Sequence, residues 1–171
     1  MLNKYLWIFI IVLISACTHV HFMSSSLYQK KNDINNIYLI VIGDEKTRSA
    51  YNYVTENLED SLKSYVNIEA KYHCCRDGRT DMKELLSSLN PSSEYTDHVL
   101  TVVTTKVVTG YGTDSSRELE IYLFDSSIQK MVWYGEVLAS MDFFVSDDHY
   151  RALAGKLSSK IMEELHLKGI I

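Results

Sequence analysis

The sequence contains none of the short motifs that mark the common catalytic and nucleotide-binding sites. Its six histidines form no HExxH motif and no other paired helical spacing, and GxSxG, GxxxxGKS/T and GxGxxG are absent. Most carboxylates fall at positions expected on exposed strand or helix faces. We therefore predict that the protein is not an enzyme and has no catalytic residue, no cofactor and no bound metal.

Basic residues and long apolar runs are also scarce. Lys and Arg number 17 against 22 Asp and Glu, which gives a net charge of −5. An acidic chain is poorly suited to nucleic acid or to wide contact with anionic lipid headgroups. The longest N-terminal apolar run, Tyr5 to Ile14, has ten residues, about half of the ~20 that cross a bilayer as a helix. Such a run, preceded by Lys4, is typical of a secretion signal.

Small residues and a cysteine follow this run. Ile14-Ser15-Ala16-Cys17 resembles the bacterial lipobox, a branched apolar residue and two small residues before a cysteine. The resemblance implies a diacylglycerol on the Cys17 sulfur, cleavage before Cys17 and acylation of the new amine. Two or three acyl chains anchor a protein stably, whereas one binds only marginally. Thr18, in place of the aspartate that marks inner-membrane retention, favours the outer membrane. The alternatives are an ordinary signal peptide with an incidental cysteine, or a short anchor helix.

The residues after Cys17 predict a tether and then one domain. Residues 18–36 are polar, with three consecutive serines and a small charge cluster, and as a flexible chain would span about 25 Å. His19 and His21 could share a metal loosely, but nothing nearby completes a ligand set. We therefore divide the chain into a signal peptide (1–16), a lipidated cysteine with a flexible tether (17–36) and a single α+β domain (37–171).

Hydrophobic spacing within the domain predicts alternating strands and helices. The sole proline, Pro91, would end a short helix at 81–90. These elements predict one mixed, largely antiparallel sheet, in the order β-α-β-(α)-β-β-β-α, with helices packed on one face. The expected strands are 37–43, 65–72, 99–110, 117–125 and 130–141, and the longer expected helices are 47–63 and 147–168.

The second half of the domain allows more specific predictions about a hairpin and the C-terminal helix. Asp125 and the serines after it suit a tight turn, which predicts an antiparallel hairpin of 117–125 and 130–141. Trp133 on that hairpin should pack under the C-terminal helix, near Leu157 or Ile161. Asp147 is expected to cap that helix, and Gly169 to end it in a left-handed conformation.

The segment HCCRDGRTD holds the two remaining cysteines, Cys74 and Cys75. Neighbouring Cα atoms lie about 3.8 Å apart, closer than the roughly 4.4–6.8 Å of an ordinary disulfide. Three states compete: a strained disulfide between the two, a bond to another chain, and two buried thiols. A metal set that adds His73 and Asp77 is too crowded along one strand to converge.

The stretches LEIYLFDSSIQKMVWYGE and LAGKLSSKIMEELHLKGII resemble small Gram-negative outer-membrane lipoproteins with a domain like that of the curli-export lipoprotein. The likeness covers Leu119 to Ile171, and the first strand and helix more loosely. It implies a sheet domain that docks with other envelope proteins, generally without catalysis. The chain has no obvious membrane-inserting amphipathic hairpin, which argues against a pore-forming role.

We therefore predict an outer-membrane lipoprotein that faces the periplasm and acts as an interaction or assembly module. The lipid on Cys17 would hold the protein to the membrane. We expect envelope proteins as partners and no binding to nucleic acid, and a homo-oligomer is possible. The twelve tyrosines suit a contact face. One alternative is a subunit of an envelope secretion or transport complex. The other is a periplasmic hydrolase, whose site would have to combine distant residues.

Overall fold

The computed structural model describes residues 20–26, 34–43, 48–74, 97–109, 114–128, 130–142 and 146–171. Cys17, Cys75 and the helix expected at 81–90 lie outside these ranges. In chain order the elements are β1 (Val20–Ser26), β2 (Asn36–Gly43), α2 (Arg48–Leu62), β3 (Asn67–Cys74), β4 (His98–Thr109), β5 (Asp114–Asp125), β6 (Lys130–Asp142) and α4 (Asp147–Leu167).

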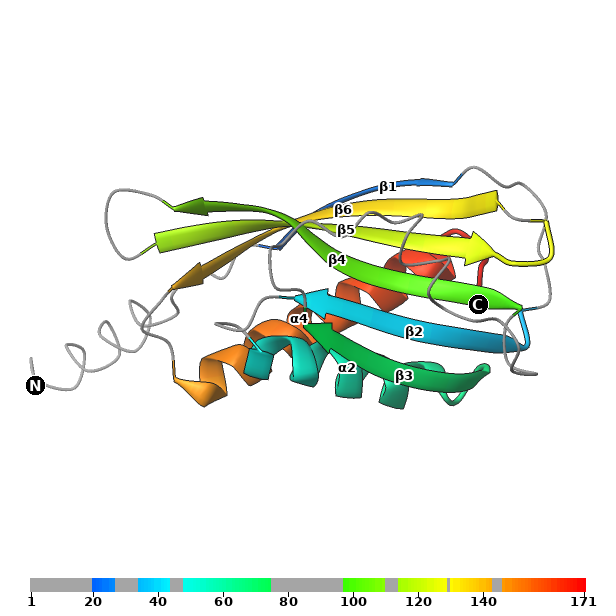
Figure 1. Ribbon diagram of the computed structural model, residues 1–171, viewed down its shortest axis with the longest axis horizontal. Helices are drawn as coiled ribbons and strands as arrows, with labels where there is room; N and C mark the ends of the chain where they lie inside the picture. The colour runs from blue at the N-terminus through cyan, green and yellow to red at the C-terminus, as the bar shows by residue number, and fades with distance from the viewer. Residues whose placement is uncertain are drawn as a thin grey trace, which may run out of the picture.

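The six strands form one mixed sheet in the order β1-β6-β5-β4-β2-β3 (Figure 1). β2 lies between β3 and β4 and runs parallel to both. The pairs β4–β5, β5–β6 and β1–β6 are antiparallel. The predicted α+β class and mixed sheet are confirmed.

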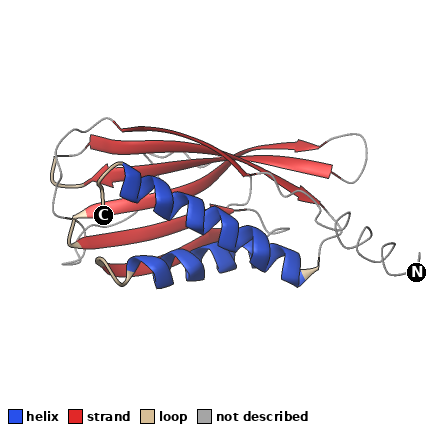
Figure 2. Ribbon diagram, turned by 180° about the vertical axis from the view of Figure 1, so that it is seen from behind, coloured by secondary structure: helices blue, strands red, loops and turns tan. Residues whose placement is uncertain are grey.

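Both helices lie on the same face of the sheet (Figure 2). In α2 a single stripe carries Tyr51, Val54, Leu58 and Leu62, and all four are buried, as the helical spacing predicts. In α4, Leu157 and Ile161 are buried in the same cluster as Trp133, which is fully buried. The predicted burial of Trp133 on the helix-covered side is confirmed, and its contact with Leu157 or Ile161 stays a prediction.

The two helices are also joined at their surface. The Tyr53 hydroxyl on α2 donates to Asp147 Oδ2 on α4 at 2.6 Å. The Arg151 guanidinium lies over the Tyr53 ring, 4.3 Å from its centroid, and its Nε is 3.4 Å from the same carboxylate oxygen. The side chains of Arg151 and Asp147 are exposed to solvent, so their ion pair adds little stability.

The two ends of α4 differ in how well the sequence predicts them. At the C-terminal end Gly169 has φ of 64°, and Ile170 N–H donates to the Leu165 carbonyl at 2.9 Å. This is the predicted left-handed stop. At the N-terminal end the capping position is Ser146 and not Asp147, so that prediction is wrong. Asp147 is instead the first helical residue.

The expected flexible tether at 17–36 is wrong for its central part. Val20–Ser26 forms β1, an edge strand that pairs antiparallel with Trp133–Ala139 of β6. Edge strands pair through backbone groups, so the polar side chains that suggested a linker do not prevent pairing. Asn36, the last residue of the expected tether, already begins β2.

Gly43 at the end of β2 makes room for a buried tyrosine. A Cβ atom at this position would lie 2.1 Å from Tyr51 Cδ2, which is far inside van der Waals contact. The ring can therefore lie against the strand only because residue 43 has no side chain. The Tyr51 hydroxyl is hydrogen-bonded to Thr104 Oγ1 of β4, and its ring stacks on Tyr72 of β3. One side chain thus ties α2 to three strands.

The hairpin of β5 and β6 forms as predicted. The Asp125 carboxylate accepts hydrogen bonds from Ser127 N–H at 2.9 Å, from Ser127 Oγ at 2.6 Å and from Ile128 N–H at 3.3 Å. This pattern is the local turn expected of an aspartate followed by serines.

Candidate functional site

The residues that the sequence singled out and that the structure describes do not come together in one site. Cys74 ends β3, and Cys75 and Cys17 lie outside the described residues, so the state of the cysteine pair stays a prediction. His149 and His166 lie apart on the exposed surface of α4. Within the described ranges no group of three His, Cys, Asp or Glu side chains is placed to hold a metal.

Among the histidines whose surroundings the structure describes, His98 is the one that is buried beside a charged neighbour. Its Nε2 lies 3.6 Å from Asp125 Oδ2, and 7% and 5% of the two side chains are exposed. Burial lowers the pKa of His98, while Asp125 and Asp97 act in the opposite direction. Burial raises the pKa of Asp125, but its hydrogen bonds from Ser127 and Ile128 and the nearby imidazole outweigh this, so the pKa falls.

This pair anchors the start of β4 to the turn after β5. Neither ring nitrogen of His98 has a hydrogen-bond partner within the described part of the chain, and the separation from Asp125 is too long for a good hydrogen bond. The hydroxyl beside the pair is that of Ser127, which donates to Asp125 at 2.6 Å as part of the turn. The geometry supports a structural role for His98 and Asp125.

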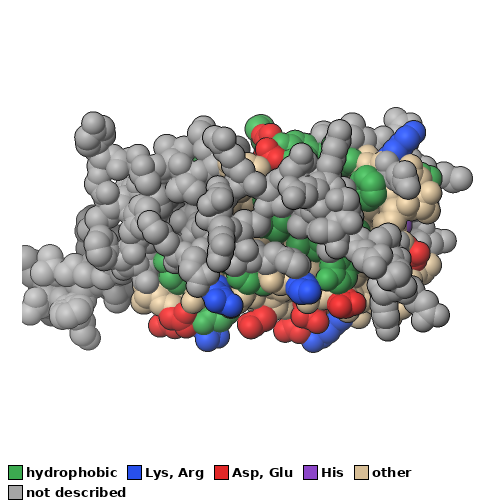
Figure 3. Space-filling model, viewed as in Figure 1, with side chains coloured by type: hydrophobic (Ala, Val, Ile, Leu, Met, Phe, Trp, Pro, Cys, Tyr) green, Lys and Arg blue, Asp and Glu red, His purple; other side chains and the backbone are tan. Residues whose placement is uncertain are grey.

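The distal face, which we define as the face of the sheet turned away from α2 and α4, has a different character. At β2 and β4 it is apolar: Ile40, Ile42, Val99 and Val103 form a second buried cluster. Toward β5, β6 and β1 it becomes a mixture of acidic, aromatic and exposed apolar side chains. Figure 3 looks onto this face and shows acidic side chains beside hydrophobic ones at its upper edge.

Two tyrosine–glutamate pairs form the centre of this mixed region. Tyr122 and Tyr134 are opposite each other on β5 and β6, as are Glu120 and Glu136. Each tyrosine hydroxyl donates to the glutamate two residues away on its own strand. The two rings are tilted at 46°, with centroids 5.3 Å apart.

Electrostatics fix the direction of these hydrogen bonds. Burial, the hydrogen bond to Glu120 and the negative charge of Glu120 and Glu136 raise the pKa of Tyr122. Burial and the hydrogen bond to Glu136 likewise raise the pKa of Tyr134. Both phenols therefore stay protonated and act as donors, and both carboxylates are held in place at the surface.

Beside these pairs the surface is hollowed into a groove of about 370 Å³. We define the β1–β6–β5 groove by its lining residues, of which Met23 and Leu138 are exposed apolar side chains, 64% and 45% accessible. Glu136 lies opposite Met23 in the strand register. The described residues that line the groove are Met23, Thr105, Glu118, Leu119, Glu120, Glu136, Val137 and Leu138.

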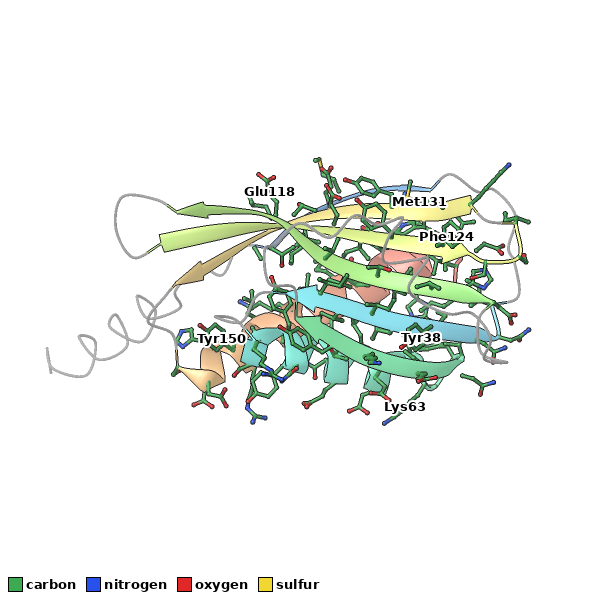
Figure 4. The ribbon with its side chains drawn as sticks, viewed as in Figure 1. Tyr38, Lys63, Glu118, Phe124, Met131 and Tyr150 are labelled. Carbon is green, nitrogen blue, oxygen red and sulfur yellow. The ribbon has the colours of Figure 1, made fainter. Side chains whose placement is uncertain are left out.

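The aromatic character continues along the hairpin away from the groove. Phe124 of β5 and Met131 of β6 are register partners, and Figure 4 shows both at the same end of the hairpin, with Glu118 farther along β5. Met131 is 37% exposed. The distal face therefore offers a strip of apolar and aromatic side chains interrupted by carboxylates, which is the composition of a contact surface.

The sequence predicts only the part of this site that lies on β5. The alternation in β5 predicts that Glu118, Glu120 and Tyr122 share one face. What it does not show is that Glu136 and Leu138 of β6 and Met23 of β1 lie on that face beside them. The groove is lined by residues of β1, β4, β5 and β6, and β1 was not expected at all.

Comparisons with known proteins assign no family. No protein-family model and no curated protein matches the chain. The PelC dodecamer from Paraburkholderia phytofirmans is 13% identical, covers 82% of this chain and 96% of that one, and has a TM-score of 0.48. Lipoprotein GNA1162 from Neisseria meningitidis is 15% identical, with 77% and 98% covered and a TM-score of 0.45.

Protein XCC0632 from Xanthomonas campestris, of family DUF330, is 10% identical, with 83% and 90% covered and a TM-score of 0.44. Similarities of this size assign the chain neither a family nor a function, and the sequence resemblance to small Gram-negative lipoproteins stays a prediction. None of the helices in the described ranges is long and apolar enough to span a membrane.

Proposed function

We propose that this chain is a lipoprotein of the bacterial envelope that acts by contact with other envelope proteins, through the distal face of its sheet. The observation that carries the proposal is the distal face itself. It keeps Met23, Met131 and Leu138 exposed beside an ordered set of tyrosines and glutamates. Exposed apolar side chains with a polar rim are typical of protein contact surfaces.

The anchor part of the proposal rests on the sequence. The lipobox-like segment ends at Cys17, and β1 begins at Val20. Three residues span at most about 11 Å, so a lipid on Cys17 would hold the sheet close to the membrane surface. The outer membrane and a periplasm-facing domain are the location we propose. In this proposal the domain acts by binding other proteins and not by catalysis. It would be either an assembly module or a subunit of a secretion or transport complex.

Metabolic labelling with an alkyne fatty acid tests the anchor. The wild-type chain should incorporate the label, and Cys17→Ala should lose it and remain uncleaved, because both steps need the thiol. A matched control is Cys74→Ala, which keeps Cys17 and should label normally. Equal labelling of the wild type and the Cys17→Ala chain would overturn the lipid anchor.

Site-specific photo-crosslinking in intact cells tests the contact face. A photoreactive residue at Leu138 should give crosslinked species. The same residue at Glu56, which is exposed on α2, should give few or none, because that side of the molecule lies behind the sheet. Crosslinks that form as readily from Glu56 as from Leu138 would contradict a contact surface on the distal face.

A further inference from the structure

We propose that the β1–β6–β5 groove binds a basic amphipathic segment of a protein partner, in which Lys or Arg residues alternate with apolar side chains. This inference rests on the proposed function, since it names the chemistry of the contact that the distal face makes.

The groove has the size and lining of a side-chain pocket. Its volume of about 370 Å³ falls in the range of roughly 300–1,000 Å³ that small ligand pockets occupy. Met23 and Leu138 supply the apolar lining from two neighbouring strands. Both side chains are largely exposed in the free chain, so an apolar residue of a partner would remove their surface from water.

The negative charge of the groove indicates that the partner segment also carries cationic side chains next to that apolar residue. Glu120 and Glu136 are direct register partners, and like charges opposite each other on neighbouring strands are unfavourable. Both carboxylates already accept one hydrogen bond from a tyrosine. A carboxylate has about four acceptor sites, so each can accept further donors. A cation placed between them would relieve the repulsion.

Glu118, the third glutamate of the groove, lies opposite Lys106 of β4 in the strand register. Glu120 and Glu136 are instead opposite each other, with Met23 opposite Glu136 on the other side. The acidic pair and the exposed apolar residues are therefore adjacent. This juxtaposition fits a segment whose side chains alternate between cationic and apolar.

The surrounding charge disfavours anionic occupants. Phosphate groups of lipid headgroups and of nucleic acid would meet three glutamates that line the groove, and the chain as a whole has a net charge of −5. Met23 follows Cys17 by six residues, which span at most about 22 Å. If Cys17 carries the lipid, the partner segment must lie close to the membrane surface.

A peptide-binding experiment on the full mature chain, held by its lipid in phosphatidylcholine nanodiscs, tests this chemistry. The probe is a fluorescent dodecapeptide of alternating leucine and arginine. The first control peptide has glutamate in place of arginine, and the second has serine in place of leucine. Fluorescence anisotropy should show binding of the first peptide, at least about tenfold weaker binding of the serine peptide, and none of the glutamate peptide.

The test variant is Glu120→Gln combined with Glu136→Gln. Glutamine keeps the length of the side chain and still accepts the tyrosine hydrogen bond, so the fold should survive, and circular dichroism checks this. Affinity for the leucine–arginine peptide should fall by about five- to tenfold, since exposed ion pairs contribute modestly. The matched control Glu56→Gln removes the same charge from α2 and should leave affinity unchanged.

Salt dependence supplies a measurement that needs no variant. Raising the salt concentration should weaken binding of the leucine–arginine peptide to the wild-type chain, because the contact is charged and exposed. Equal affinity of the wild type and the double variant for this peptide, binding of the glutamate peptide, or salt-independent binding would each overturn the proposal. A chain that passes these tests but whose Cys17→Ala form labels normally would retain the groove and lose the lipid anchor.

Discussion

The two faces of the sheet are built from the same strands but have opposite character. On β6, Trp133 is fully buried in the core on the helix-covered side, whereas its neighbour Tyr134 is half-buried on the distal face. Farther along, Val137 is buried and Leu138 is 45% exposed. The helix-covered face consists of apolar side chains that α2 and α4 remove from water. The distal face of β5, β6 and β1 retains carboxylates and exposed apolar groups. The first arrangement stabilises the domain, and the second leaves surface available for contact.

Substitutions at two adjacent residues of β6 should show the largest difference in stability between the two faces. Trp133→Ala should lower the free energy of unfolding by about 3–5 kcal/mol, because it removes a fully buried ring. Tyr134→Ala, one residue away on the distal face, should lower it by about 1 kcal/mol or less, since part of that ring is already solvated. Urea unfolding of both variants measures the difference. Similar losses would show that the distal face contributes as much stability as the helix-covered face.

A pair of glycines provides the next comparison. Gly43→Ala should destabilise the domain by about 1–3 kcal/mol, because the new Cβ would lie 2.1 Å from the Tyr51 ring beneath the helices. Gly155→Ala in α4 meets no atom within 4 Å and should stabilise it by about 0.5–1 kcal/mol, since alanine favours a helix. Thermal unfolding should place the two melting temperatures on opposite sides of the wild type. A Gly43→Ala chain as stable as the wild type would contradict the close packing of Tyr51.

The helix-covered face should also respond to pH. Burial holds the pKa of His98 below its usual value of 6.5. As the pH falls through 6.5 the unfolded chain takes up a proton that the folded chain does not. Stability is therefore full above this value, declines below it, and levels off below the folded-state pKa. The pKa of Asp125 is lowered from 3.8, so this residue contributes only at more acidic pH.

Urea midpoints at about pH 7.5, 6.5 and 5.5 measure this effect. The wild type should lose more stability over this range than His98→Gln, which cannot titrate. The comparison uses the slope with pH and not the absolute stability, because glutamine and imidazole differ in shape and in packing. Parallel slopes for the two chains would exclude a buried neutral His98.

The smallest effect on stability is expected at the groove. Glu120→Gln with Glu136→Gln removes two like charges from opposite strand positions, so stability should stay unchanged or rise by about 0.2–1 kcal/mol. Chemical denaturation under the same conditions as for Trp133→Ala measures this. A loss of more than about 2 kcal/mol would mean that these carboxylates hold the fold together, which would remove the reason to regard them as a contact surface.

Much of the fold could be predicted from the sequence because its signals are local. The alternation of Leu119, Ile121 and Leu123 defines the inner face of β5, and Asp125 defines the turn that follows. Gly169 marks the end of α4. Each of these depends on residues within a few positions of one another, and each is confirmed.

The rest depends on contacts between distant segments. No local pattern shows that β1 joins β6, since an edge strand pairs through its backbone and tolerates polar side chains. The same holds for the sheet order, in which β2 lies between β3 and β4. The groove combines residues of four strands, so it could not be predicted before β1 was placed. The cap of α4 was misplaced by one residue because Ser146 and Asp147 are both favourable capping types.

The pairing of β1 with β6 has a consequence for how the chain folds. Val20 near the start of the described chain pairs with Ala139 near the end of the last strand, so the two partners are separated by almost the whole domain. Ribosomes make the chain from its N-terminus, and β1 therefore has no partner until β6 has been synthesised. Pairing of such distant segments requires the closure of a long loop and slows folding. During that interval the segment that will form β1 is unpaired, and it could pair with another copy of the chain. Production of this protein should therefore depend on keeping nascent chains apart until their last strand is complete.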